Sequence, residues 1–261
     1  MRSSPELIES RQNPTLKRVR GIVAGKEKNT LLLEGLHLVT DALGARAGIE
    51  IILLDERTDP HPLLDAGADP ELMRWVKGGL LDGIGGILSS PGVVALATPP
   101  PAVELSSLQP GPQDLLLVTC GIADPGNLGA LARAAEAAGA RALVHAEGGV
   151  SPWNSRALRG SMGSLLRLPV VCGIGATEVA GTLTSLGWKS VVAATREGQS
   201  FMDFSWSGPR ALWVSGETSG PPECCADFEQ VTIPMAGQVE SLNVSVAGAL
   251  LLFAAGRVSG Q

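Results

Sequence analysis

The sequence of 261 residues predicts an α/β protein with two domains. Residues 114–256 alternate apolar strand-like runs with helical patterns, which favours a parallel sheet. Residues 99–112 are rich in proline and have no periodicity, as expected of a linker. Residues 1–98 mix strand-like and helical patterns. We therefore expect a small α/β domain over 1–98, a linker over 99–112 and a second domain over 113–261.

In the first domain, residues 31–43 begin like a strand and continue with apolar side chains at helical spacing. Residues 49–56 and 92–97 are apolar runs of strand length. The glycine-rich stretch 78–88 lacks the G-x-G-x-x-G spacing and follows no clear strand, so it predicts a turn rather than a nucleotide loop.

In the second domain, residues 114–121 predict a buried strand, and the helix that follows ends at Gly139, a suitable residue after a helix C-terminus. The last helix is expected from Asn243 to Gly256. Between these two helices, further strands are expected at 142–146, 190–195, 211–216 and 230–235.

Composition excludes several classes of protein. Apolar residues make up 44% of the chain, enough for a sizeable core, so global disorder is excluded. The longest apolar run, near residues 246–255, is far shorter than the ~20 residues of a membrane span. The first residues contain no apolar secretory segment, so we expect a cytoplasmic protein. The spacing of the four cysteines and three histidines matches no zinc site, and no metal is expected.

Positive charge is concentrated at the beginning of the chain. The first 28 residues contain seven basic and three acidic side chains, a net charge of +4, which leaves −10 for the remainder. This is either a solvated helix face or a patch that contacts phosphates. The candidate phosphate-binding side chains are Arg11, Lys17, Arg18 and Arg20.

Three polar segments follow predicted strands, at the edge where parallel α/β sheets bind ligands. They are residues 124–129, residues 215–220, and residues 233–235 with 241–245. Each also has a purely structural interpretation, because asparagine and serine commonly cap helices and glutamate is common in surface turns.

Together these segments resemble the three motifs of the SpoU/TrmH family of RNA 2′-O-ribose methyltransferases, in the SPOUT superfamily. They read DPGNLGALARAAEAAGA (124–140), SGETSG (215–220) and IPMAGQVESLNVSVAGALLL (233–252), and residues 154–170 resemble a further family segment. The resemblance implies a trefoil-knotted α/β domain that binds S-adenosylmethionine and forms a homodimer. The first domain resembles the substrate-binding domain of the ribosomal protein L30e type that precedes many such catalytic domains, although the family's aromatic residue before Glu34 is a leucine here.

The same resemblance implies roles for individual residues. The implied catalytic residues are Asn127, Arg133, Glu217, Ser241 and Asn243. The implied cofactor contacts are Thr195, Ser215, Gly216, Ile233 and Leu242. Ser215 stands where the family usually has glycine. In the second domain, Arg156 and Arg159 are alternative RNA-binding residues.

We therefore expect an S-adenosylmethionine-dependent enzyme that methylates a ribose 2′-hydroxyl of RNA, in 23S ribosomal RNA by family analogy. The alternatives are a tRNA 2′-O-methyltransferase and a non-catalytic RNA-binding paralogue with the same fold. A nucleotide-dependent oxidoreductase is disfavoured, because no G-x-G-x-x-G follows the first strand of either domain.

Overall fold

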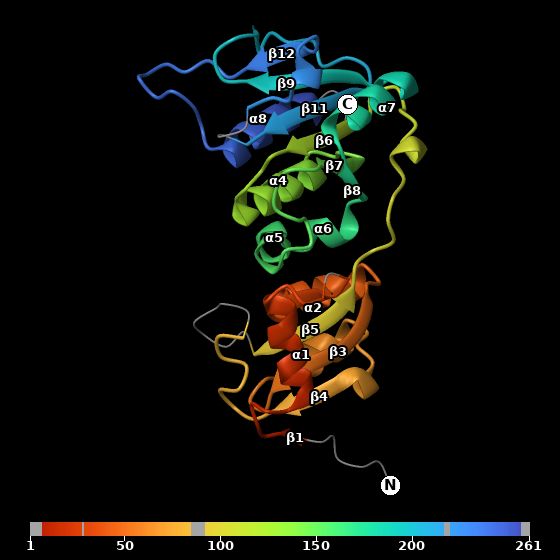
Figure 1. Cartoon of the computed structure of the whole chain (residues 1–261), viewed down its shortest axis with the longest axis vertical. Coiled ribbons are helices and arrows are strands. Elements are labelled where there is room, and N and C mark those ends of the chain that lie inside the picture. The colour runs from red at the N-terminus through yellow and green to blue at the C-terminus, as the bar shows by residue number, and fades with distance from the viewer. Residues whose placement is uncertain (1–6, 28, 85–91, 217–219, 257–261) are drawn as a thin grey trace. The chain divides into compact units, whose positions relative to one another are not determined.

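The computed structural model describes residues 7–27, 29–84, 92–216 and 220–256, and its contacts divide the chain into two compact units (Figure 1). The first unit comprises Met1–Pro101 and Trp153–Arg167, and the second comprises Ala102–Pro152 and Leu168–Gln261. The predicted domain boundaries, 1–98 and 113–261 with a linker over 99–112, stay a prediction.

The first unit is built on a mixed five-stranded sheet in the order β1-β4-β3-β5-β2. Its strands are β1 (Leu7–Ile8), β2 (Leu31–Glu34), β3 (Gly48–Asp55), β4 (Met73–Val76) and β5 (Val93–Thr98). The central strand β3 pairs with β4 in parallel and with β5 in the antiparallel direction. The α/β character expected of residues 1–98 is thus present in this unit.

Helices cover this sheet. Helix α1 (Pro14–Val23) begins where the Asn13 side chain accepts a 2.9 Å hydrogen bond from Thr15 N, and Pro14 occupies its first turn. Leu16 and Val19 of α1 enter a core with residues of β2, β3 and β5. Helix α2 (Leu36–Gly44) contacts β2, β5 and the short helix α3 (His61–Asp65), and a 3₁₀ turn (Pro70–Leu72) precedes β4.

Residues 153–167 form two short helices, α5 (Ser155–Ser161) and α6 (Ser164–Arg167), and α5 contacts β2. Gly163 makes the turn between them, with a φ of +82°. A Cβ at this position would collide with the side chains of Arg167 and Asp41, so the turn requires glycine for both backbone conformation and space.

The second unit is built on a seven-stranded sheet in the order β10-β12-β9-β11-β6-β7-β8, and every pairing between its strands is parallel. The strands are β6 (Leu115–Cys120), β7 (Ala142–Ala146), β8 (Val170–Ile174), β9 (Lys189–Ala194), β10 (Gln199–Ser200), β11 (Arg210–Ser215) and β12 (Glu229–Thr232). The predicted parallel sheet is confirmed. The knot stays a prediction.

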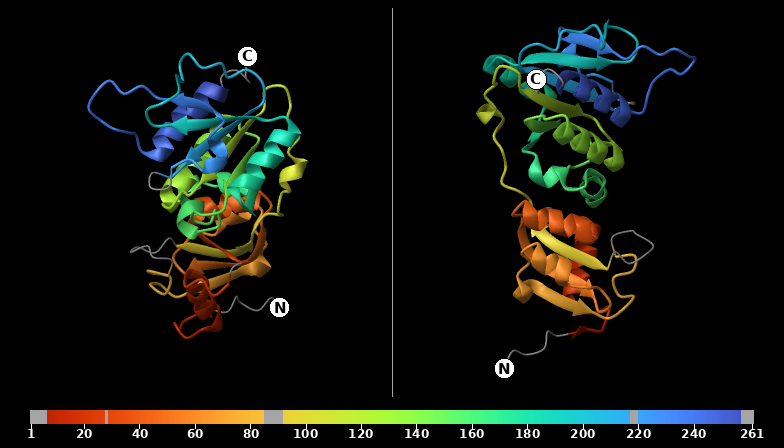
Figure 2. Two further views of the ribbon diagram at one scale, coloured as in Figure 1. Left: turned by 45° about the horizontal axis from the view of Figure 1, so that its top comes forward. Right: turned by 180° about the vertical axis from the view of Figure 1, so that it is seen from behind.

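Helices α4 (Pro125–Ala137) and α8 (Val244–Gly256) pack together on one face of this sheet, and α7 (Ala176–Leu186) packs on the other (Figure 2). The two helices approach closely because α8 contains Gly248, where a Cβ would collide with Leu131 of α4. The predicted helix end at Gly139 is confirmed, since Gly139 has a φ of +79° after the last turn of α4.

The structure adds detail where the sequence pattern is weak. Strands β1, β4, β8 and β10 have two to five residues each, too few for a clear alternation. Within the proline-rich stretch, Leu105 and Leu108 are buried in the core of the second unit, and Trp188 Nε1 donates a 2.7 Å hydrogen bond to the Leu108 carbonyl. Residues 78–84 form turns as predicted, and residues 85–88 lie outside the described residues.

Candidate active site

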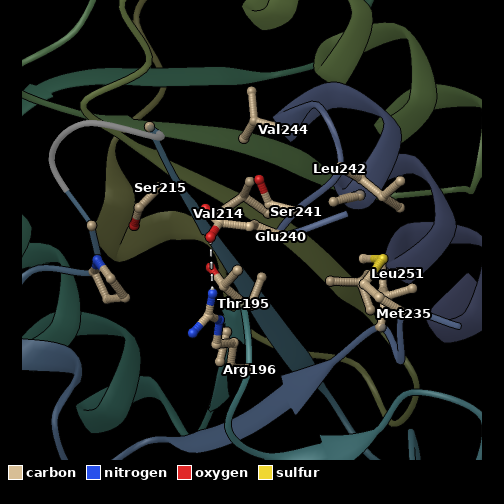
Figure 3. A pocket seen from close by; sticks show the side chains of 17 residues that line it. Thr195, Arg196, Val214, Ser215, Met235, Glu240, Ser241, Leu242, Val244 and Leu251 are labelled. Carbon is tan, nitrogen blue, oxygen red and sulfur yellow. Dashed lines mark hydrogen bonds and ion pairs between the residues drawn. The ribbon is translucent and has the colours of Figure 1, made fainter. Parts of the chain in front are cut away.

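A cavity of about 310 Å³ opens beyond the carboxyl ends of β9, β11 and β12 (Figure 3). Four chain segments contribute to its wall: residues 193–196 at the end of β9, residues 214–216 at the end of β11 with 220–221, residues between 233 and 242 after β12, and Val244, Ala247 and Leu251 of α8. This is the edge at which parallel α/β sheets bind ligands, because loops rather than strands can present polar groups there.

The structure brings all five sequence-predicted cofactor contacts to this pocket. Thr195, Ser215, Gly216, Ile233 and Leu242 all line it. They come from three loops separated by up to 47 positions in the chain, and the strand order β12-β9-β11 makes the loops neighbours. Motifs that are far apart in the sequence therefore meet at one cavity.

The pocket wall has an apolar part and a polar part. The apolar part includes Ile233, Met235, Leu242, Val244 and Leu251. The polar part includes Thr195, Ser215 and, at an exposed edge, Arg196, whose Nη2 lies 3.4 Å from Glu240 Oε1. Such a wall suits a ligand that has both a flat apolar ring and charged or hydroxyl groups.

Asn127 has a role other than capping its helix. Asp124 caps α4 instead, with Oδ1 accepting a 2.9 Å hydrogen bond from Asn127 N. This leaves the Asn127 side chain free of the helix terminus, and its Oδ1 accepts a 3.1 Å hydrogen bond from Asn243 Nδ2. Two motifs that are 116 positions apart are joined by this contact.

Asn243 caps a helix and also contacts a residue of another motif. Its Oδ1 accepts hydrogen bonds from Ser245 N at 2.9 Å and Ser245 Oγ at 2.6 Å, so it caps the first turn of α8. Its Nδ2 simultaneously contacts Asn127. Ser241 and Leu242, immediately before it, line the pocket, which places the asparagine pair beside the cavity.

Arg133 lies on α4 two turns after the helix begins, and its side chain is exposed. Among the residues that the structure describes, it has no hydrogen-bond or ion-pair partner, so its guanidinium is available to a ligand. Glu217, the acidic residue of the second motif, lies outside the described residues.

A buried polar pair lies behind the loop that leads into α4. Thr119 Oγ1 and His145 Nδ1, at the ends of β6 and β7, are 2.8 Å apart, and burial lowers the pKa of His145 to about 4. The histidine is therefore neutral at physiological pH.

A backbone hydrogen bond connects two loops near Asn127. Val150 N donates to the Ile122 carbonyl at 2.8 Å, which connects the loop after β7 to the loop before Asn127.

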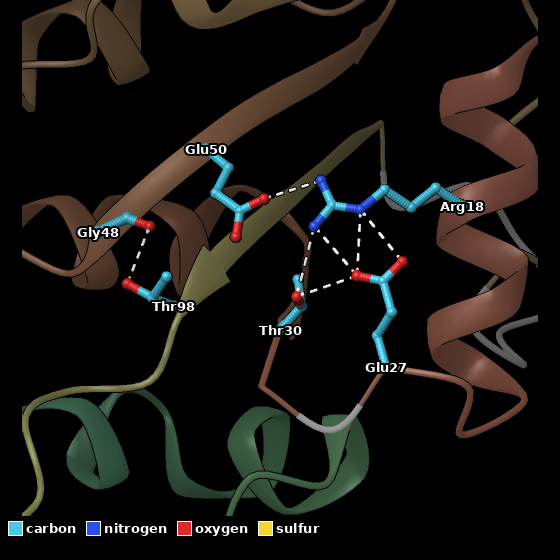
Figure 4. Close-up of polar contacts among 6 residues, drawn as sticks. All are labelled: Arg18, Glu27, Thr30, Gly48, Glu50 and Thr98. Atoms are coloured by element: carbon cyan, nitrogen blue, oxygen red, sulfur yellow. Dashed lines mark hydrogen bonds and ion pairs between the residues drawn. The ribbon is translucent and has the colours of Figure 1, made fainter.

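The candidate phosphate-binding residues, Arg11 before α1 and Lys17, Arg18 and Arg20 within it, differ in how far other groups engage them. The Arg18 guanidinium is held by two carboxylates, with Nε and Nη2 3.1 Å from Glu27 Oε2 and Nη1 2.8 Å from Glu50 Oε2 (Figure 4). These partners raise the pKa of Arg18 further and lower that of Glu27. Lys17 and Arg11 are exposed, and Arg20 donates to the Arg11 carbonyl at 2.8 Å. Arg18 is thus the least available of the four for a phosphate.

Arg159 also has an internal partner. Its Nη1 donates a 2.7 Å hydrogen bond to Oε2 of Glu34 within the first unit, and the Glu34 side chain is only 1% exposed. Burial raises the pKa of Glu34, and the positive charge of Arg159 opposes that rise. Arg156 is exposed on the same helix.

Sequence reasoning did not identify Arg196, Glu240 or Met235 as pocket residues. Two of them adjoin a predicted residue, since Arg196 follows Thr195 and Glu240 precedes Ser241, and Met235 lies two positions after Ile233. Their position in the loops that follow β9 and β12 was the available signal.

No group of three or more histidine, cysteine, aspartate or glutamate side chains suited to a metal ion occurs in the described part of the chain. Among the helices of the described residues, none is long and apolar enough to span a bilayer.

Comparisons with known proteins identify the family. The SpoU rRNA methylase family model matches residues 114–253, just over half of the chain. The chain is 29% identical over 253 residues to the 23S rRNA (guanosine(2553)-2′-O)-methyltransferase RlmP of Bacillus subtilis, covering 94% of this chain and 97% of that protein. It is 35% identical over 241 residues to the 23S rRNA (guanosine-2′-O-)-methyltransferase RlmB of Ralstonia nicotianae, covering 87% and 95%.

Solved structures agree. A crystal structure of an RNA 2′-O ribose methyltransferase superposes with a TM-score of 0.81 at 31% identity, covering 97% of this chain and 98% of that one. The AdoMet-bound rRNA methyltransferase of Sinorhizobium meliloti shares the fold with a TM-score of 0.84 at 24% identity, over 97% and 98% of the two chains. The predicted family resemblance is confirmed: this chain belongs to the SpoU rRNA methylase family.

Proposed function

We propose that this protein transfers the methyl group of S-adenosylmethionine to a ribose 2′-hydroxyl of 23S ribosomal RNA. The observation that carries the proposal is the pocket at the ends of β9, β11 and β12, with the Asn127–Asn243 hydrogen bond beside it. A methyl donor and a ribose must meet at one place, and this edge offers a ligand cavity next to polar side chains from two motifs.

The residues present fit the donor. The apolar wall formed by Ile233, Leu242 and Leu251 suits a purine, and Thr195 and Ser215 suit hydroxyl or amino-acid groups. Ser215 Oγ is buried without a hydrogen-bond partner among the described residues, as expected of a group that a ligand completes. When bound, S-adenosylmethionine supplies an electrophilic methyl group on a positively charged sulfur.

The side chains of the protein then position and activate the hydroxyl. Asn127 Oδ1 is occupied by Asn243, so its amide NH₂ is the part left to donate to a ribose oxygen. Arg133 contributes a planar, positively charged guanidinium group. The guanidinium orients the hydroxyl and stabilises the negative charge that develops on its oxygen as the O–CH₃ bond forms, the S–CH₃ bond breaks and the hydroxyl proton passes to solvent water. Holding the oxygen in line with the methyl group supplies much of the acceleration.

The substrate is proposed from the relatives. Both curated relatives described above are named as 23S rRNA guanosine 2′-O-methyltransferases, and each is matched over nearly its whole length. A tRNA substrate and a non-catalytic RNA-binding role are the alternatives. The unpaired Arg133 and the assembled pocket favour catalysis over binding alone.

The test is a methylation assay with radiolabelled S-adenosylmethionine and the purified full-length protein. Incorporation into deproteinised 23S rRNA, but not into total tRNA, supports the proposal, and mapping of 2′-O-methyl sites identifies the nucleotide. Incorporation into tRNA alone would identify the protein as a tRNA 2′-O-methyltransferase instead. No incorporation into either RNA, despite S-adenosylhomocysteine binding, favours the paralogue.

We also propose that the protein acts as a homodimer in the cytoplasm. Helix α8 buries Val244, Leu251, Leu252 and Ala255 within its own unit. Its opposite side exposes Val246, Leu250 and Phe253, whose exposed fractions are 49%, 42% and 47%. An apolar stripe at helical spacing on an exposed face is typical of a helix that packs against a second chain.

A further inference from the structure

The hydroxyl of Ser215 is an unusual feature of the pocket. Three buried side-chain atoms in the described residues have no hydrogen-bond partner, namely Glu34 Oε1, Ser164 Oγ and Ser215 Oγ. Of these three residues, only Ser215 lines the pocket. Buried polar groups without partners are uncommon because each forfeits its hydrogen bonds to water.

The position of Ser215 is fixed by its backbone. It is the last residue of β11 and pairs in register with Cys120 of β6, and Gly216 N donates to the Cys120 carbonyl at 2.9 Å. These ladder contacts hold the backbone on both sides of the side chain. Only the rotation of the hydroxyl about its own bonds remains, so the group can be completed from the pocket but not by a shift of the strand.

We propose that Ser215 Oγ forms a hydrogen bond with a polar group of the bound S-adenosylmethionine. This inference rests on the proposed function, because it takes the pocket as the methyl-donor site. Ser215 is then an affinity-determining contact peculiar to sequences with a hydroxyl at the end of β11, since a glycine there has no side chain that could make the bond.

The distribution of the wall residues indicates which part of the donor is involved. Leu242, Met235 and Leu251 lie together on one side of the pocket, and Ser215 lies on the other (Figure 3). A purine seated against the apolar side directs its ribose and amino-acid groups towards the polar side. The partner of Ser215 is therefore a ribose hydroxyl or the amino-acid tail rather than the purine ring.

Isothermal titration of the full-length protein tests this inference, with S-adenosylhomocysteine as the probe. Ser215→Ala is expected to weaken binding about three- to tenfold, the effect of one neutral hydrogen bond. Ser164→Ala is the matched control, because it also removes a buried hydroxyl without a partner among the described residues, but Ser164 lies on α6 and does not line the pocket. Its affinity for the probe is expected to equal that of the wild type.

A second readout separates ligand contact from structural support. Removing a hydroxyl that has no partner should leave the melting temperature of the ligand-free Ser215→Ala protein unchanged or slightly higher. Titration with 5′-methylthioadenosine, which lacks the amino-acid tail, locates the contact. If Ser215→Ala loses as much affinity for this probe as for S-adenosylhomocysteine, the bond is made to the nucleoside. If its affinity for this probe equals that of the wild type, the bond is made to the amino-acid tail.

The outcomes separate the two proposals. If the wild type binds S-adenosylhomocysteine and Ser215→Ala binds it equally well, the inference about Ser215 is overturned while the proposed function stands. A lower melting temperature that accompanies the loss of affinity also overturns it, because the hydroxyl then supports the fold. If the wild type does not bind S-adenosylhomocysteine, the proposed function fails, and the inference fails with it.

Discussion

Asn243 uses both ends of its side-chain amide, and this explains why a helix cap can also be a site residue. The oxygen holds the first turn of α8, and the nitrogen reaches Asn127 on α4. An aspartate would cap equally well but could not donate to Asn127. The requirement for both a donor and an acceptor favours asparagine at this position.

Replacing Arg133 should separate chemistry from cofactor binding. Arg133 is exposed on α4, whereas the pocket residues come from β9, β11, β12 and α8. We expect Arg133→Ala to reduce the rate of methyl transfer by about 100-fold or more, with the affinity for S-adenosylhomocysteine changed only a few fold. Arg133→Lys should also be slow, since an ammonium group lacks the planar fork. Equal losses of rate and cofactor affinity would show that the arginine belongs to the cofactor site.

His145 should make stability depend on pH. Its pKa is about 4 in the folded protein against a usual value of 6.5, so the unfolded chain takes up the proton first as the pH falls. The stabilisation is present above pH 6.5 and is lost between pH 6.5 and about 4, by up to about 3 kcal/mol. Urea unfolding at pH 7 and pH 4.5 measures this loss. His145→Gln should flatten the dependence, and an unchanged pH slope in that variant would contradict the assignment.

The basic patch comprises Arg11 and the basic residues of helix α1, and its charges are not equivalent. Glu27 and Glu50 engage Arg18, while Lys17 and Arg11 are exposed. Mutating all the basic residues of the helix at once would therefore confuse RNA binding with stability, because Arg18 connects α1 to the strand β3 that contains Glu50. Separate variants avoid this problem.

The double variant Arg11→Gln, Lys17→Gln should weaken rRNA binding and reduce the steepness of its salt dependence. Each lost phosphate contact lowers the slope of log K against log salt by about 0.7 to 0.9. Arg18→Gln is the matched control, expected to lower the melting temperature but to leave the salt slope near that of the wild type. Filter binding between 50 and 200 mM salt, a range of roughly fourfold, measures both. If the control alone flattens the slope, the phosphate contact belongs to Arg18.

Helix α8 is apolar on every side, and its two sides meet different partners. Gly248 and Leu251 pack within their own unit, and Leu250 and Phe253 remain exposed. The sequence pattern indicates only that the helix has more apolar surface than one contact needs. The structure identifies which residues form the exposed stripe.

The exposed stripe of α8 gives the test of the proposed dimer. Leu250→Glu with Phe253→Glu should convert the dimer to a monomer, because two carboxylates cannot be buried at an apolar interface without a large cost in free energy. Light scattering at micromolar concentration measures the mass. Met202→Glu is the control, since Met202 is 72% exposed and lies outside α8. A monomeric wild type would contradict the proposal.

For the chain as a whole, the division into units does not follow the order of the sequence. Residues 153–167 interrupt the second unit, between β7 and β8, but make their contacts in the first, where Arg159 meets Glu34 and Ala157 and Leu158 are buried. Deleting residues 1–98 removes these partners. The point variants described above, made in the full chain, are therefore better tests of RNA selection than a truncation that isolates residues 113–261.

The sequence by itself determined the parallel α/β sheet, the helices α4 and α8, the family and five of the residues that line the pocket. These features depend on local patterns, such as the buried run at 115–120 and the helix end at Gly139, or on motifs that adjoin strand ends. They can be read from one segment at a time because each strand or helix buries its own apolar face.

Only the tertiary structure decided which polar groups meet. The Asn127–Asn243 and Glu34–Arg159 contacts join residues 116 and 125 positions apart, and no local pattern encodes a partner at that distance. The same holds for Arg18, which looks like a free cation in the sequence until β3 brings Glu50 to it. Partner choice depends on the order of strands in the sheet, and that order is fixed by the packing of the whole core rather than by any one segment.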